Sequence, residues 1–510
     1  MSRHRRRSHH DIVVYGATMP GVATVRAIAE SRADPTSVLV IKPQPGIGGI
    51  GCAGGQNFWD VRPWAEAESW EFPQGGSFRR WFRTQGQAYD TDRMVTTLYE
   101  DLAHEGVTVR TRYDVEEVSL DADGRITAVD IRPLARTGGD THWTGDRQVA
   151  SGSVFVDASE TGRLSRLVDV SRTVGRSDSG PDDRQMAATL MVQVEGIDWA
   201  AVRKAEDPDG EPVFRTAVDG DEDKRLLWGG EQSLGKPGVS RFREAYPRLD
   251  IKALNAAEHK DGVFWLNALL IYDVDGRYDA RERGRTSASG ARDPWDRDRA
   301  RRRATSAVDD AAFEAAIAEF PGFEETTVRY EDGEPRVGDV LYVRETIHLL
   351  RDGSHEVEDR HAEDAGPRPG TGADKEFYES RIGLGYYWLD NNGYTRTATG
   401  ADSSLEATDN PIFLPYEALT TPDCPNLLVP GYPVSIDSRA WCALRVLPNL
   451  CVLGDAAGVA AGIATESSVD PADFGGTQLE RLRNRLRTDC EAILEKRALT
   501  GPEPPARGRD

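Results

Sequence analysis

Short apolar runs on either side of a helical pattern open the chain and predict a parallel α/β unit. Residues 11–16 (DIVVYG) form a β-rich run that ends at glycine, residues 21–32 carry small and apolar side chains at helical spacing, and residues 38–41 form a second β-run. Strand, helix and strand within about 30 residues predict a βαβ unit with a right-handed crossover. Residues 1–10, rich in Arg and His, are predicted to be a disordered lead-in.

Apolar periodicity predicts further elements in two ordered stretches. The first holds a helix at 91–105 and strands at 107–112, 115–120, 126–133 and 154–156. The second holds buried strands at 426–429 and 450–453, a small-residue helix at 454–465 and an amphipathic helix at 478–496. Between them the chain is richer in Trp, Asp and Arg, with polar loops and a helical stretch at 307–319. This change of character predicts a second domain.

Composition narrows the class of protein. The 510 residues include 63 basic and 85 acidic side chains, for a net charge of −22 and a pI near 5.0. This balance argues against a general nucleic-acid partner, because phosphate requires a cationic face. No run of about 18 apolar residues is evident, so we expect no membrane partner. Five cysteines with no CxxC pair and no Cys/His cluster predict reduced thiols, a cytoplasmic location and no metal site.

The turn after the first strand has the residues of a dinucleotide site. Gly16 permits a tight turn, and Gly21 allows the helix to pack closely on the strand. Such a turn points backbone N–H groups and the positive end of the helix at a pyrophosphate. Thr18 stands at the middle position, where its hydroxyl is a potential donor to phosphate. An ordinary βα turn is the alternative.

The end of the second strand departs from the dinucleotide pattern. An Asp or Glu normally accepts there from the adenosine ribose hydroxyls, whereas this chain has Lys42. Lysine cannot accept a hydrogen bond. Three alternatives follow: backbone groups hold the ribose, Lys42 contacts a phosphate, or the affinity for adenosine is weakened.

A second glycine element lies near the other end of the chain, in VLGDAAG (452–458). The pattern predicts a strand, a glycine turn and a helix of Ala and Gly against which a cofactor can lie. The helix N-terminus would favour the negative charge that a flavin gains on reduction. Asp455 would accept from ribityl hydroxyls. A small-residue core helix is the alternative.

Taken together, these blocks resemble the two-part FAD site of glutathione-reductase-like flavoproteins and, more narrowly, an FAD-dependent oxidoreductase family that includes xanthan-lyase-like bacterial proteins. The resemblance rests on the following segments: DIVVYGATMPGVA (11–23), IGGIGCAGG (47–55), VFVDASETGRLSRLVDV (154–170), RQMAATLMV (184–192), LYVRET (341–346), IGLGYYWLD (382–390), FLPYEALT (413–420) and NLLVPGYPVSIDSRAWCALRVLPNLCVLGDAAGVAAGIA (426–464).

The resemblance implies FAD as the cofactor and assigns residues to it. Its implied contacts are these: pyrophosphate at Gly16, Thr18, Gly21, Ala158 and Ser159; close approach at Gly48 and Gly49; adenine at the backbone of Val115; and ribityl and flavin at Asp455, Gly458 and Val459. The chain departs from the family at Lys42, where an acid is usual, and at Glu160-Thr161 and Arg163, where aromatic and acidic residues are usual. It also has Asp455 where glutamine is frequent. The first departure leaves the ribose contact open.

Candidate catalytic residues follow from the expected flavin. Tyr387 or Asp390 would take a proton from the substrate during hydride transfer, and His348 is another possible base. Arg445 would pair with a substrate carboxylate or stabilise reduced flavin, with a structural salt bridge as the alternative. Cys52 has no second cysteine nearby in the sequence, which argues against dithiol–disulfide chemistry. The remaining alternatives for Cys52 are a packing residue, a covalent tether or a catalytic thiol.

We therefore expect an α/β fold: a Rossmann-like FAD-binding domain from residues 11–175 and 411–470, with an inserted mixed α+β substrate domain at 176–410. A C-terminal helix at 471–500 and a loose tail at 501–510 complete it. The expected function is oxidation of a small organic substrate by hydride transfer to flavin N5, with reoxidation by oxygen or another acceptor. An NAD(P)H-dependent flavin monooxygenase and a non-catalytic nucleotide-binding protein with a decayed FAD site are the alternatives. The substrate is not predicted, and self-association is possible.

Overall fold

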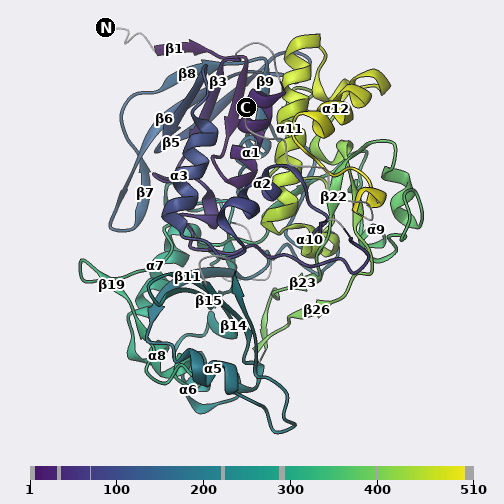
Figure 1. The fold of residues 1–510 in the computed structure, drawn as a ribbon. Helices are drawn as coiled ribbons and strands as arrows, with labels where there is room; N and C mark the ends of the chain where they lie inside the picture. The colour runs from purple at the N-terminus through teal and green to yellow at the C-terminus, as the bar shows by residue number, and fades with distance from the viewer. Residues whose placement is uncertain are drawn as a thin grey trace.

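A five-stranded parallel sheet with a helical layer on one face forms the first part of the molecule (Figure 1). The computed structural model describes residues 6–31, 36–68, 70–219, 224–286, 293–397 and 400–499. The strand order is β28 (Leu427–Leu428), β9 (Val154–Asp157), β2 (Ile12–Tyr15), β3 (Val38–Lys42) and β4 (Val107–Thr111). All four pairings are parallel, and helices α1 (Met19–Glu30) and α3 (Thr91–Leu102) cover one face. The predicted βαβ unit is confirmed.

Alternate residues of the central strands face two different cores. Ile12 and Val14 belong to the core under the helices, whereas Val13 and Tyr15 belong to the core shared with a second sheet. This two-sided burial explains why the strand consists of four consecutive large apolar or aromatic residues. The parallel sheet is therefore a middle layer.

The second sheet covers the other face of the parallel sheet. Its order is β1 (Arg6–His9), β8 (Gln148–Ser151), β6 (Ile126–Thr137) and β5 (Tyr113–Leu120), with β7 (Asp140–Trp143) paired to β6. The strands predicted before residue 160 are thus confirmed. The predicted disordered lead-in is wrong for residues 6–9, because β1 pairs in parallel with β8. Residues 1–5 lie outside the described part of the chain, as do those of the expected tail.

A six-stranded antiparallel sheet forms the inserted part and has a separate hydrophobic core (Figure 1, lower half). Its order is β12 (Phe214–Asp219), β13 (Lys224–Gly229), β14 (Leu249–Lys260), β15 (Val263–Ile271), β11 (Ala188–Glu195) and β18 (Thr327–Val328). Four helices pack with it: α5 (Trp199–Lys204), α6 (Pro237–Ala245), α7 (Arg297–Val308) and α8 (Ala311–Ile317). The helix predicted at 307–319 is wrong in extent, since α7 ends and α8 begins within that stretch, where Asp310 caps α8. The expected α/β class with an inserted mixed unit is confirmed.

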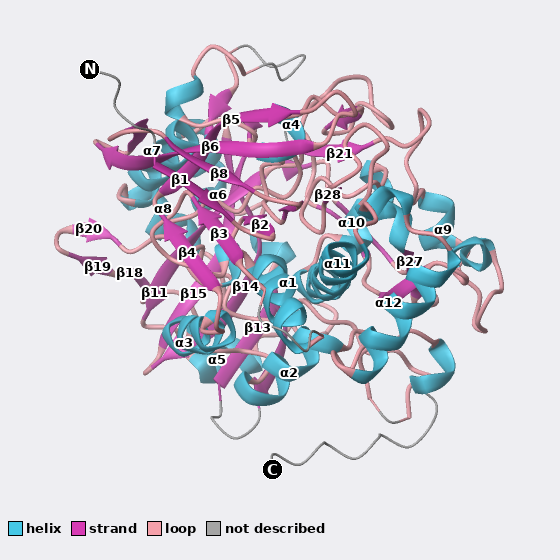
Figure 2. Ribbon diagram, turned by 90° about the horizontal axis from the view of Figure 1, so that it is seen from above, coloured by secondary structure: helices cyan, strands magenta, loops and turns pink. Residues whose placement is uncertain are grey.

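The long helix α11 (Leu447–Ser467) replaces the predicted strand and glycine turn (Figure 2). It begins after Val446, with Pro448 in its first turn, and continues through Gly454 without a break. The strand prediction at 450–453 is wrong because a short apolar run fits a buried helix as well as a buried strand. By length and composition α11 would also pass for a membrane span, contrary to our expectation, but its apolar window is entirely buried within the protein.

The remaining C-terminal elements are α10 (Ser438–Leu444), α12 (Gly476–Thr488) and the short 3-10 helix η8 (Lys496–Leu499). The amphipathic helix predicted at 478–496 is therefore too long at its C-terminal end. The other helices and strands are α2 (Gly76–Gln85), α4 (Arg163–Leu167), α9 (Asp359–Glu363), β10 (Arg172–Val174), β16 (Val274–Asp275), β17 (Trp295–Asp296), β19 (Tyr330–Glu331), β20 (Glu334–Pro335), β21 (Ile347–Leu349), β22 (Arg381–Gly385), β23 (Leu389–Asn391), β24 (Arg396–Thr397), β25 (Gly400–Ala401), β26 (Ser404–Glu406) and β27 (Ile412–Pro415).

Candidate functional site

The turn between β2 and α1 has the backbone of a phosphate-binding turn. Gly16 has φ of +103°, and a Cβ there would lie 2.9 Å from the carbonyl of Ala158. A Cβ on Gly21 would lie 1.8 Å from the Gly16 carbonyl oxygen. Only glycine fits both positions, as the sequence predicted.

The Thr18 side chain is hydrogen-bonded to two backbone groups of the protein. Its Oγ1 accepts from the backbone N–H of Gly21 at 3.3 Å, which caps α1, and its hydroxyl donates to the carbonyl of Ala158 at 2.6 Å. The expectation that this hydroxyl faces a phosphate is therefore wrong in this conformation. Ser159 is similar, because its hydroxyl donates to Asp157 Oδ1 at 2.6 Å and so orders its own turn.

The second glycine pair lies directly against the first turn. Gly48 and Gly49 have φ of +82° and +56°, and the Gly48 N–H donates to the carbonyl of Ala17 at 2.7 Å. A Cβ on Gly49 would lie 2.5 Å from Oε1 of Glu160 and 3.2 Å from a methyl carbon of Thr18. The Glu160 carboxylate therefore occupies the cradle formed by the two glycine elements.

Lys42, at the end of β3, is a positive group that interacts electrostatically with that carboxylate. It is fully buried, and burial lowers its pKa while the charge of Glu160 opposes the shift. The unusual lysine thus has an acidic counterpart in this chain, at one of the positions where the sequence departs from the family pattern.

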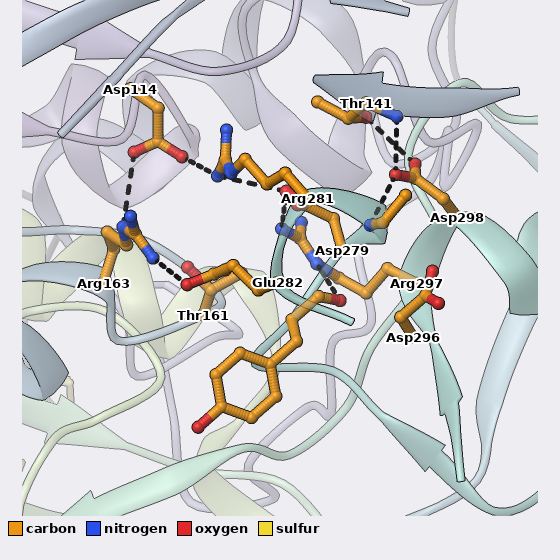
Figure 3. A network of polar contacts seen from close by, with 12 residues as sticks. Asp114, Thr141, Thr161, Arg163, Asp279, Arg281, Glu282, Asp296, Arg297 and Asp298 are labelled. Carbon is orange, nitrogen blue, oxygen red and sulfur yellow. Dashed lines mark hydrogen bonds and ion pairs between the residues drawn. The ribbon is translucent and has the colours of Figure 1, made fainter. Parts of the chain in front are cut away.

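Both backbone groups of Val115 are already hydrogen-bonded. Its carbonyl accepts from Arg163 Nε at 2.9 Å and Nη2 at 2.8 Å, and its N–H donates to Oδ1 of Asp114 at 2.6 Å. Figure 3 shows the Asp114 carboxylate between the guanidinium groups of Arg163 and Arg281. The implied adenine contact is therefore taken by side chains of the protein.

Asp455, Gly458 and Val459 lie inside α11, not at its start. A Cβ on Gly454 or Gly458 would lie 2.3 Å or 2.2 Å from the carbonyl oxygens of Pro20 and Thr24, so these glycines allow α11 to pack tightly on α1. Asp455 Oδ2 accepts from the N–H of Ser77 at 2.7 Å, and Oδ1 lies 3.6 Å from Arg26. The predicted position of these residues after a turn is wrong, and Asp455 links α11 to α2.

A cavity of about 430 Å³ lies between the antiparallel sheet and the segments around β23 and residues 59–61. Its walls combine aromatic side chains with charged groups. The aromatic members are Trp59, Trp228, Tyr387 and Trp388, and the charged members include Asp60, Arg215, Glu231, Arg243, Asp250, Lys252 and Asp390. Concave, aromatic-lined sites with a few polar groups are typical of small-molecule sites.

Asp60 and Lys252 are among the groups in this cavity whose pKa values are shifted toward neutrality. Burial raises the pKa of Asp60 to about 6, against the opposing charge of Arg445. Burial, together with the nearby charge of Arg344, lowers the pKa of Lys252 to about 8. Each group also contributes electrostatically to the shift of the other, which indicates that they lie close in space. Such paired shifts in a cleft are typical of functional sites.

Two of the predicted catalytic residues, Tyr387 and Asp390, line this cavity, and a third, Arg445, is ion-paired with Asp390. Arg445 Nη2 lies 2.7 Å from Oδ2 of Asp390, and Nη1 donates to the hydroxyl of Tyr342 at 3.1 Å. The Tyr387 hydroxyl lies 3.4 Å from Oδ1 of Asp60, and burial raises its pKa well above the usual value. The cavity therefore connects Tyr387, Asp390 and Arg445 to an acid that the sequence analysis did not identify.

His348 and Cys52 lie in other surroundings. His348 is fully buried beside Glu345, at 3.5 Å, and against the ring of Trp441. Cys52 is buried under Gly48, and burial raises the pKa of its thiol to about 12. A neutral buried thiol is a poor nucleophile, so the packing interpretation of Cys52 is favoured over the catalytic one.

Within the described ranges of the chain, one group of side chains brings possible metal ligands close together. Asp90, Asp92 and His259 place their ligand atoms within 4.8 Å of one another. Asp90 caps α3, however, and His259 Nδ1 accepts from the N–H of Thr91 at 3.3 Å. Asp90 and His259 therefore lie together because both accept hydrogen bonds from the first turn of α3.

The parallel sheet, the glycine cradle and the cavity beside an antiparallel sheet define a Rossmann-type flavoenzyme. The chain belongs to the FAD dependent oxidoreductase family, whose family model matches residues 11–486. The sequence-based assignment to that family is confirmed, and FAD is the family's cofactor. A search of curated proteins finds no match.

The solved structures that the chain resembles are distant from it. The myxobacterial chondrochloren halogenase CndH is 16% identical, over 66% of this chain and 65% of that chain, with a TM-score of 0.32. PqsL, a probable FAD-dependent monooxygenase from Pseudomonas aeruginosa, is 10% identical over 97% of this chain and 98% of that one, with a TM-score of 0.35. The halogenase PltM in complex with FAD is 10% identical over 94% and 73%, with a TM-score of 0.37. The chain thus spans about two thirds of the first of these proteins.

The fit of FAD to these residues divides into two parts. The backbone fits, because Gly16, Gly21 and Gly49 form a cradle in which any Cβ would meet other atoms of the cradle. Two side chains lie at the positions that the rest of FAD would take: Arg163 donates to the Val115 carbonyl, and the Glu160 carboxylate lies against Gly49. The glycine cradle would hold the pyrophosphate in competition with Glu160, and the adenine would compete with Arg163.

Proposed function

We propose that this FAD-family oxidoreductase acts on a small organic molecule that binds in the 430 Å³ cavity. The observation that carries the proposal is the convergence of Asp60, Lys252, Tyr387 and Asp390 on that cavity. The redox chemistry expected of FAD when it is bound, acceptance of a hydride at N5 followed by reoxidation by oxygen or another acceptor, belongs to this proposal.

The aromatic walls favour a substrate with a planar or aromatic part. Trp59, Trp228 and Trp388 are among the residues that line the cavity, and aromatic rings pack well against one another. Lys252 is half-buried at the cavity and, as a cation, would hold an anionic or strongly polar oxygen of the substrate. An aromatic hydroxy acid or a related aromatic alcohol or amine satisfies both requirements.

Asp60 is the proposed proton acceptor. When a hydride leaves carbon, the neighbouring O–H or N–H of the substrate must lose a proton, and a carboxylate with a pKa of about 6 can take it near neutral pH. Tyr387 and Gln56 orient Asp60, because their donor atoms lie 3.4 Å and 3.1 Å from its two oxygens. The ion pair of Arg445 with Asp390 holds the neighbouring wall in position.

The test is the pH dependence of FAD reduction under anaerobic conditions, measured as bleaching of the flavin absorbance by a panel of aromatic hydroxy acids, alcohols and amines. The rate of reduction should rise as Asp60 ionises near pH 6 and fall as Lys252 loses its proton near pH 8. Asp60→Asn should reduce the rate by about 10²–10⁴-fold. Lys252→Met should remove the alkaline limb, and Lys260→Met, an exposed residue on the same strand, is the matched control.

Full activity of Asp60→Asn with an unchanged pH profile would refute the role of this pair. We also propose a small-molecule partner, no nucleic-acid or membrane partner, and a cytoplasmic location. The alternative of a non-catalytic protein with a decayed FAD site is favoured by one specific observation, the occupation of Val115 by Arg163.

A further inference from the structure

The backbone N–H and C=O of Val115 are both hydrogen-bonded within the protein, to an acceptor and to donors of the kind that an adenine ring has. Adenine presents an amino donor next to a ring-nitrogen acceptor. Here Arg163 supplies two donors to the Val115 carbonyl, at 2.9 Å and 2.8 Å, and Asp114 supplies the acceptor for the N–H at 2.6 Å. Side chains of the protein thus satisfy the backbone N–H and C=O of Val115, the two groups that would otherwise hydrogen-bond to adenine.

These internal partners are fixed from several directions. Arg163 Nε lies 3.7 Å from Asp114, and Nη1 is ion-paired with Glu282 of the 3-10 helix η4 (Ala280–Glu282). Asp114 is also paired with Arg281, as Figure 3 shows. The side chains of Arg163 and Asp114 are 5% and 1% exposed, so the network is buried and its charges depend on one another.

A second, separate contact fills the pyrophosphate end. The Glu160 carboxylate lies against Gly49 and Thr18, in a cradle whose glycines have positive φ. Lys42, where an acid is usual, provides the opposite charge. A carboxylate in this position repels a pyrophosphate and also denies it space. The two departures from the family pattern, at the end of β3 and in the 160–163 segment, therefore act together.

We propose that Arg163 and Glu160 form an internal plug that occupies the adenosine and pyrophosphate positions of the FAD site, so that dinucleotides bind only by displacing both side chains. Arg163 is the discriminating residue, because it blocks the adenine edge and leaves the flavin end untouched. The network borders a second cavity, of about 280 Å³, whose lining includes Asp279, Arg297 and Asp298. That space can receive rearranged side chains when a ligand enters.

The experiment compares binding of FAD, ADP and FMN to the full-length protein, by quenching of ligand or tryptophan fluorescence. The variant is Arg163→Ala combined with Glu282→Gln, which frees the Val115 carbonyl and removes both charges of the buried pair. We expect it to bind FAD and ADP at least tenfold more tightly than the parent, and FMN with unchanged affinity. FMN has no adenosine, so it separates the adenine position from the flavin position.

Two further variants keep the test decisive. Arg163→Lys retains the charge beside Glu282 but loses the two-pronged donation to Val115, so it should show a smaller gain in affinity for FAD and ADP. It provides the measurement in case the double variant does not fold. Arg172→Met with Asp169→Asn neutralises a neighbouring, partly exposed ion pair and should leave the affinity for FAD, ADP and FMN unchanged. Equal affinity of parent and folded variants for ADP, whether tight or undetectable, would overturn the proposal. Because ADP and FMN binding is read without turnover, the result is independent of the proposed substrate cavity.

Discussion

Asp455 provides a direct test of the difference between a ligand-binding carboxylate and a structural one. It is 1% exposed and accepts hydrogen bonds from the backbone N–H and the hydroxyl of Ser77, with Arg26 at 3.6 Å. Burial nevertheless raises its pKa to about 6, since the loss of water outweighs these partners. The perturbation is Asp455→Asn, which keeps the shape and removes the charge.

The magnitude follows from the pKa. Each tenfold change in a proton dissociation constant is worth about 1.36 kcal/mol, so a rise from 3.8 to about 6 corresponds to roughly 3 kcal/mol. The folded-state pKa lies above the unfolded one, so this contribution to stability is complete below about pH 4 and is lost as the pH rises through about 6. The parent therefore loses up to this amount relative to the variant between pH 4 and pH 7.5.

The assay is urea unfolding of parent and variant at several pH values, followed by tryptophan fluorescence. The difference in the free energy of unfolding should move by roughly 2–3 kcal/mol in favour of Asp455→Asn between pH 4 and 7.5. Asp473→Asn, at an exposed carboxylate, controls for the substitution itself. A difference that stays constant with pH would refute the reasoning, because it would mean that water or a bound group reaches this carboxylate.

Two further predictions concern packing and thiol chemistry. Gly458→Ala should destabilise the protein by about 1–3 kcal/mol in urea unfolding, because the new methyl group would lie 2.2 Å from a carbonyl of α1; Gly476→Ala, with no atom within 4 Å, should change the free energy by less than about 0.5 kcal/mol. All five cysteines are buried, and the pKa of Cys52 is raised to about 12, so a thiol reagent at pH 8 should label the native protein only as fast as it unfolds. Rapid labelling of Cys52 in the folded protein would contradict this.

Local sequence determined the parts of the protein that depend on neighbouring residues. The β2–α1 unit was predictable because the apolar run, the glycine turn and the helix lie within one stretch, and each element limits the next. The family could also be identified, since its blocks follow one another along the chain. The glycines of the cradle were predictable for the same reason: a positive φ or a close approach permits only one residue type.

The tertiary structure decided which groups meet. The run 450–453 became part of α11 because the neighbouring α1 accepts a helix with glycines on its contact face, a fact absent from the run itself. Asp60 and Lys252 come from distant segments, and their pKa values shift mainly because folding removes water from both. Arg163 donates to the carbonyl of Val115, which lies 48 residues earlier in the sequence. Burial and long-range contact, unlike backbone preference, depend on the whole chain, and for that reason only the folded molecule revealed the cavity and the plug.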